Sequence, residues 1–224
     1  MTKSPAAKSL KDQNKWQLWL AIAVNAAAAY AAARWTDMTT TGLHGVLDSV
    51  LHLLPVGLAV LVTTVANALV GPEAKYRLVF LRWHHALPGH RAFTEHGPRD
   101  PRVDLSKVKR LLGNKVPQDP EEQNKAWYRL YKQVEKAPLV ESVHRDFLLL
   151  RDYTALSALF VLALGAVAAF AVRPITVLLG YLCLLILQFL LVRLAAANCG
   201  KRFVTTVLAE QSVANPPGKR ATTP

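Results

Sequence analysis

Four apolar stretches, each free of Asp, Glu, Lys, Arg and His, limit how this chain can fold. They cover Trp16 to Ala33, Leu53 to Val70, Tyr153 to Val172 and Ile175 to Val192. A helix needs about 20 apolar residues to cross the hydrocarbon core of a bilayer, and each stretch is close to that length. The pattern predicts an all-α, polytopic membrane protein with four transmembrane helices arranged as two hairpins.

The positions of the basic residues predict how these helices are threaded. Of the 27 Lys and Arg residues, four lie in the tail up to Lys15, sixteen between Lys75 and Arg151, and five after the fourth stretch. Only Arg34 and Arg173 fall in the two remaining connections. Basic residues beside spanning helices are retained in the cytoplasm. We therefore expect a multi-pass protein of the bacterial inner membrane, with both termini and the segment between spans two and three in the cytoplasm.

The composition along the chain predicts five parts. These are a basic cytoplasmic tail (1–15), a first transmembrane hairpin (16–71), a cytoplasmic helical region (72–138), a long helix with the second hairpin (139–200), and a cytoplasmic helix extension with a disordered tail (201–224). A secretory signal ending near Ala31 to Ala33 is the alternative for the first stretch, but its apolar run is long for a signal core.

Helix start and stop signals organise the cytoplasmic region. Asp104 is expected to cap a short helix that closes near Gly113, and Asp119 with Pro120 opens a helix that runs to about Lys136. Pro138 starts a helix with no breaker before the third apolar stretch, which predicts one rod of roughly 35 residues, about 50 Å long.

Two further segments follow the second apolar stretch. Gly71 and Pro72 interrupt the helix, and Lys75 to Leu87 is expected to resume it as a stub at the membrane surface. Leu87 to Arg102 holds three prolines and two glycines, a density that predicts an ordered loop or an extended connection.

This loop region carries the candidate chemistry. Its histidines supply the candidate metal ligands, His85, His90 and His96, and its other candidate functional residues are Arg91, Glu95 and Asp100. The histidines lack the i, i+4 spacing of a helical metal site, so we expect no cofactor and keep a metal site as the alternative. The spacing of Arg91 and His96 resembles the Arg-x4-6-His pattern of the HEPN ribonucleases, which implies an RNA-cleaving dimer. That family carries the motif on a helix, whereas prolines and glycines flank it here.

Polar residues within and beside the apolar stretches are a second candidate group. Inside them lie Asn25, Thr63, Asn67 and Gln188, which are expected to hydrogen-bond between helices or to line a water path. In the first outer connection, Asp48 and His52 lie four residues apart. On a helix they would share one face, and an interfacial ion pair is the favoured interpretation.

The net charge of +12 favours an anionic membrane surface over nucleic acid as the partner, because the charged signs are interspersed. The apolar stripes of the small helical region need partners, so we expect a homo-oligomer that binds a cytoplasmic protein or a small-molecule ligand.

In architecture the chain resembles the small four-span effectors of bacterial defence operons, which implies membrane permeabilisation on activation. An enzyme is less favoured. The alternatives are a metal-dependent or nuclease-like enzyme that uses the histidine-rich loop, and a small channel or transporter.

Overall fold

The computed structural model describes residues 14–40 and 54–213, and within these two ranges every regular element is helical. The elements are α2 (Lys15–Ala33), α4 (Leu54–Leu69), α5 (Pro72–Phe80), the 3-10 helix η2 (Pro88–Arg91), the π-helical turn η3 (Ala92–His96), α6 (Gly97–Arg99), α7 (Leu105–Leu111), α8 (Pro120–Val134), α9 (Pro138–Ala171) and α10 (Ile175–Val213). The all-α prediction holds for this part of the chain.

Three of these helices, α2, α9 and α10, are long and apolar enough to cross a membrane. The second apolar stretch forms α4, and the predicted interruption at Gly71 and Pro72 is present. There the structure has α4 followed by α5, and a break at residues 70–71 bends the pair by 102°. The bend has a local cause, because Gly71 is extended and Pro72 opens the next helix without needing a backbone N–H partner.

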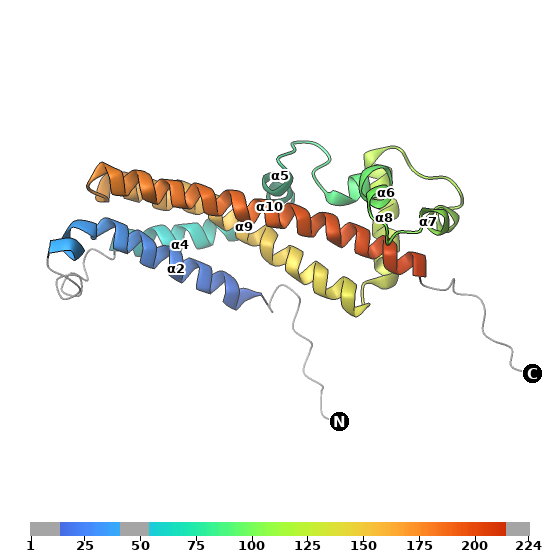
Figure 1. Cartoon of the computed structure of the whole chain (residues 1–224), viewed down its shortest axis with the longest axis horizontal. Coiled ribbons are helices and arrows are strands. Elements are labelled where there is room, and N and C mark those ends of the chain that lie inside the picture. Colours follow the sequence, from blue (N-terminus) through green and yellow to red (C-terminus); the bar gives the residue numbers. More distant parts are fainter. Residues whose placement is uncertain (1–13, 41–53, 214–224) are drawn as a thin grey trace, which may run out of the picture. The chain divides into compact units, whose positions relative to one another are not determined.

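The chain divides into two compact units. The first unit contains the described residues up to Leu81 together with Leu148–Ala197, and the second contains Arg82–Phe147 together with the described residues from Asn198 onward. The predicted rod is present as α9, a single helix of 34 residues, and α10 has 39 (Figure 1). Each of these two helices contributes residues to both units.

In the first unit, α2 and α4 lie side by side, and α9 and α10 complete the bundle (Figure 1). Small residues allow close packing: Ala29, Ala32 and Ala59 are buried in the same core as Phe160 and Leu164. Large apolar side chains point away from the core instead; they include Leu58, Leu61, Val62, Leu162, Phe170, Leu179, Leu187 and Leu191.

In the second unit, helix caps act as the sequence predicts. The Asp104 carboxylate accepts hydrogen bonds from the backbone N–H groups of Ser106 and Lys107, and Asp119 accepts from those of Glu121 and Glu122. The interior is largely apolar and aromatic, and its buried residues include Phe93, Val103, Val108, Ala126, Trp127, Leu130, Val140, Val143, Phe147, Phe203, Val204, Val207 and Leu208.

Two predictions for this region were wrong. The stub after the second stretch ends at Phe80 rather than Leu87, because Leu81 adopts a left-handed conformation (φ 49°) that turns the chain out of the helix. The segment from Leu87 to Arg102 is mostly helical and not extended: η2, η3 and α6 follow one another through it. Its prolines fit because Pro88 and Pro98 lie in the first turns of η2 and α6, where a backbone N–H has no helical partner.

Candidate functional site

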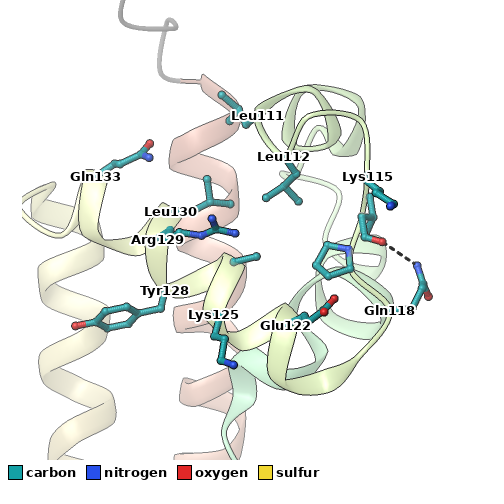
Figure 2. A pocket seen from close by; sticks show the side chains of 13 residues that line it. Leu111, Leu112, Lys115, Gln118, Glu122, Lys125, Tyr128, Arg129, Leu130 and Gln133 are labelled. Atoms are coloured by element: carbon teal, nitrogen blue, oxygen red, sulfur yellow. Dashed lines mark hydrogen bonds between the residues drawn. The ribbon is translucent and has the colours of Figure 1, made fainter.

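The second unit has an open groove of about 1050 Å³ between α8 and the connection that follows α7. Figure 2 shows Leu112, on the connection, and Leu130, on α8, on facing sides of the groove, with Arg129 between them. The other apolar lining residues are Leu111, Val116, Pro117 and Ala126. A cavity of this size and shape suits a peptide segment better than a small molecule.

The connection that walls the groove is built from local signals. Gly113 takes a left-handed backbone (φ 71°), and Asn114, beside it, is also left-handed (φ 63°). The N–H of Asn114 donates to the Lys109 carbonyl, which ends α7. Asp119 then starts α8, so the groove lies between two fixed helix termini.

The groove has an apolar floor and a basic rim. Lys115, Lys125 and Arg129 line it, against one acidic residue, Glu122. None of the three cations forms an ion pair with another residue in the described ranges. An excess of solvated positive charge around an apolar floor is complementary to an acidic, apolar-faced ligand.

Gln123 fixes α8 against η3, and sequence reasoning missed it. Its side chain is buried, and Oε1 accepts hydrogen bonds from the N–H groups of Phe93 (3.2 Å) and Thr94 (3.3 Å). Its Nε2 donates to the Gln118 carbonyl at 3.1 Å. Close packing at Gly89 adds to this, because a Cβ there would lie 2.9 Å from Cε3 of Trp127 and collide with Asn124.

An aromatic cluster supports the other side of α8. Trp127 and Tyr131 pack edge-on against Phe203, which stacks on His144 with ring centroids 4.6 Å apart. The Tyr131 hydroxyl lies 3.1 Å from Nδ1 of His144, and burial raises the pKa of Tyr131. Gln211 anchors α10 by donating from Nε2 to the Leu130 carbonyl (2.8 Å). These contacts hold the groove-lining face of α8 in place.

The candidate metal ligands do not come together as a set. The ring centroids of His85 and His90 lie 5.2 Å apart, with the ring planes at 79°. His96 lines a pocket to which neither of these two histidines contributes. Burial lowers the pKa of His90 and lowers that of His96 to about 4, so the His96 ring is neutral at pH 7. Within residues 14–40 and 54–213, no group of three or more His, Cys, Asp or Glu side chains is placed to hold a metal ion.

The other candidates of this segment form ion pairs with one another and with nearby arginines. Glu95 lies between Arg91 (3.5 Å) and Arg99 (3.2 Å). Asp100 is held by Arg102 through two contacts, Nε to Oδ1 at 3.0 Å and Nη2 to Oδ2 at 2.7 Å, and this keeps the Asp100 pKa well below its ordinary value. Arg91 and His96 do lie on helical turns, in contrast to the expected loop.

The polar residues of the apolar stretches behave differently from one another. Asn25 and Thr63 donate to carbonyls of their own helices, those of Ala21 and Ala59. Neither bond joins two helices, because each side chain reaches the carbonyl four residues earlier in its own helix.

Gln188 makes the expected contact between helices, because its Nε2 donates to the Tyr153 hydroxyl at 2.9 Å. The Asn67 Oδ1 atom is buried and has no hydrogen-bond partner among the described residues. Asp48 and His52 lie outside the described residues, so their pairing stays a prediction.

The first unit contains a buried ionic cluster that sequence reasoning also missed. Asp152 accepts from Lys75 (Nζ to Oδ1, 3.2 Å) and from Arg151 (Nη2 to Oδ1, 2.9 Å), and all three residues are at most 7% exposed. Arg151 also lies over the Tyr76 ring, 5.3 Å from its centroid. Two buried cations share one carboxylate here, so each depends on Asp152.

Comparisons with known proteins give no match: neither a family model, nor a curated protein, nor a solved structure resembles this chain significantly.

Proposed function

We propose that this chain is an oligomeric, multi-pass protein of the bacterial inner membrane whose second unit binds an acidic protein segment and whose first unit then acts on the bilayer. The observation that carries the proposal is the sharing of α9 and α10 between the two units. A ligand that changes how either helix packs in the second unit acts on a helix that also belongs to the first.

Lipid is the solvent that fits the exterior of the first unit. Leu61, Leu162, Phe170 and Leu187 are more than half exposed, and a soluble monomer rarely exposes so many large apolar side chains on one bundle. We assign α2, α9 and α10 as spans and α4 with α5 as the fourth, which bends at the membrane surface. With the basic residues inside, both termini and the second unit are cytoplasmic.

The partner that suits the groove is an acidic segment with one apolar face. Its apolar side chains would replace water over Leu112 and Leu130, and its carboxylates would meet Lys115, Lys125 and Arg129. Such charge pairing contributes mainly to association rate and specificity, and the apolar floor contributes most of the affinity.

The action on the bilayer is proposed from the architectural resemblance to four-span effectors of bacterial defence operons. An Ala-rich α2 and the small-residue seam of Gly165 and Ala169 on α9 suit packing between helices or between copies. On this account, partner binding favours an oligomer that permeabilises the membrane.

Induced expression of the full chain in bacteria tests membrane action directly. Entry of a membrane-impermeant dye, together with growth arrest, is the expected result when the partner is present or the chain is overproduced. A chain that leaves dye exclusion unchanged at every expression level, and that is a monomer by native mass spectrometry in detergent, contradicts the proposal.

Charge reversal in the groove tests the link between the units. Lys125→Glu with Arg129→Glu should weaken binding of a fluorescent peptide carrying Glu and Leu at helical spacing by about tenfold or more, which corresponds to about 1.4 kcal/mol or more. Arg110→Glu with Lys136→Glu makes the same charge change at exposed positions outside the groove and serves as the matched control. Equal loss in both double variants would show that only the overall charge matters.

A further inference from the structure

A second basic pocket of the same unit, about 560 Å³ in volume, lies where α10 meets the segment around α6. Its lining includes His96, Arg99, Arg102, Lys201, Arg202 and Thr205. Lys201 and Thr205 lie four residues apart on α10 and so share one face of that helix. Arg102 joins the two walls, because its Nη2 donates to the Thr205 hydroxyl at 3.3 Å.

The ion pairs within this pocket do not neutralise all of its positive charges. Asp100 is the one carboxylate in its lining, and it is paired with Arg102 through the two contacts described above. Arg99 pairs with Glu95 at 3.2 Å. Lys201 and Arg202 form no ion pair with any residue in the described ranges, so two positive charges face the pocket uncompensated.

The buried ring of His96 adds a neutral donor to these charges. It is 6% exposed, and no hydrogen bond joins it to another described residue. Burial and the nearby positive charges of Lys201, Arg82 and Arg91 keep its pKa low. A neutral imidazole always presents one N–H, which can donate to an anionic oxygen without adding charge to the site.

We infer that this pocket binds a phosphate group, with Lys201 and Arg202 supplying the charge and His96 a neutral hydrogen bond. Three donors from two walls suit the several acceptor oxygens of a phosphate better than the single face of a carboxylate. The inference does not depend on the groove, whose lining shares no residue with this pocket.

Two sources of phosphate fit this chemistry. Lys201 follows the fourth apolar stretch on the same helix by a rise of about 14 Å, so its long side chain can extend back toward lipid headgroups. The same side chain also meets dissolved phosphate compounds in the cytoplasm. The experiment therefore needs one arm for each source.

The test uses the full chain in detergent and isothermal titration calorimetry with three probes. Inorganic pyrophosphate reports a dissolved phosphate, dioctanoyl phosphatidic acid a lipid phosphate, and dioctanoyl phosphatidylcholine the lipid tails alone. The variant is Lys201→Gln with Arg202→Gln, both exposed positions whose change leaves the core intact. The control is Lys109→Gln with Arg110→Gln, an exposed basic pair outside the pocket that loses the same charge.

We expect at least one anionic probe to bind, with affinity falling about tenfold or more in the Lys201 and Arg202 variant, since two charge-assisted contacts are lost. The control should stay within about twofold of the parent. Binding of phosphatidic acid alone identifies a headgroup, and binding of pyrophosphate identifies a dissolved phosphate compound. The inference is overturned if neither anion binds, if phosphatidylcholine binds equally well, or if the control loses as much affinity as the variant.

Discussion

The first and second units both have apolar cores, but they expose different kinds of side chain. Around the first, large apolar residues such as Leu162 (70% exposed) and Phe170 (86% exposed) point outward, while Lys75 and Asp152 lie inside. Around the second, cations point outward and aromatic rings such as Trp127 and Phe203 fill the interior. The difference supports the proposed placement of the first unit in lipid and of the second in water.

The helix α10 carries this contrast within one continuous element. Its first half exposes Leu179, Leu184, Leu187 and Leu191, and its last turns bury Val204, Val207 and Leu208. In water each exposed apolar side chain of this kind would cost about 1.5–3 kcal/mol relative to burial. The helix can therefore be stable along its whole length only if its surroundings change along it.

The largest expected effect is the loss of an aromatic ring from the core of the second unit. Phe203→Ala removes the ring that contacts Trp127, Tyr131, His144 and Phe147. We expect the free energy of unfolding of this unit to fall by about 3–5 kcal/mol, because the lost contacts leave a cavity. Pulse proteolysis of the full chain in detergent measures the change.

Leu187→Ala is the matched truncation on the exposed face of the first unit. A side chain that packs on detergent or lipid rather than protein leaves no cavity, so this variant should lose under about 0.5 kcal/mol. An equal loss of stability in Phe203→Ala and Leu187→Ala would contradict the proposed difference between the two units.

The next largest effect comes from the buried carboxylate of the first unit. Asp152→Asn leaves Lys75 and Arg151 without their shared counter-charge, and we expect a loss of about 3 kcal/mol. Thermal unfolding of the detergent-solubilised chain reports it. Glu73→Gln, which removes an exposed partner of Arg77, should lower stability by about 0–1 kcal/mol and is the control. Similar shifts for both would mean that the Asp152 cluster is solvated.

A smaller effect is expected at the start of α8, beside the groove. Asp119→Ala removes the side chain that accepts from the N–H groups of Glu121 and Glu122, and the second unit should lose about 1 kcal/mol. Glu121→Ala changes an exposed first-turn residue that caps nothing, and it should cost less. Hydrogen exchange of the first α8 amides separates the two, and unchanged protection in Asp119→Ala would contradict the capping role.

The last prediction concerns the chemical reactivity of the Cys199 thiol and involves no change in stability. Burial raises its pKa to about 11, so at pH 8 its thiolate is scarce. In a Cys183→Ser background, the rate of iodoacetamide alkylation should climb about tenfold per pH unit up to about pH 11, since only the thiolate reacts. A rate that levels off near pH 9 would show that the thiol is open to water.

Local signals in the sequence predicted much of the fold. Asp104, Asp119 and Pro138 each start the helix expected of them, because caps and first-turn prolines act within a few residues. The unbroken pattern after Pro138 likewise predicted α9 as one helix. The interruption at Gly71 and Pro72 was predicted too, because it is a local signal, whereas the helical turns after Leu87 were missed, since tertiary packing decides them.

The candidate site was less predictable. Gln123 reaches Phe93 thirty residues away, and Lys75 reaches Asp152 seventy-seven residues away. Nothing in the local pattern marks such partners, and a glutamine on a helix usually faces solvent. The histidines are close together in the sequence, yet in the structure His85 packs against His90 whereas His96 lines a separate pocket.

On the proposed topology, α10 passes from lipid into the cytoplasm between Leu187 and Lys201. Single cysteines at these two positions, in a chain lacking Cys183 and Cys199, test it with a membrane-impermeant maleimide on intact spheroplasts and on inverted vesicles. We predict that Leu187→Cys stays unlabelled in both and that Lys201→Cys is labelled only in inverted vesicles. Labelling of Leu187→Cys in either preparation, or of Lys201→Cys in intact spheroplasts, would contradict the account.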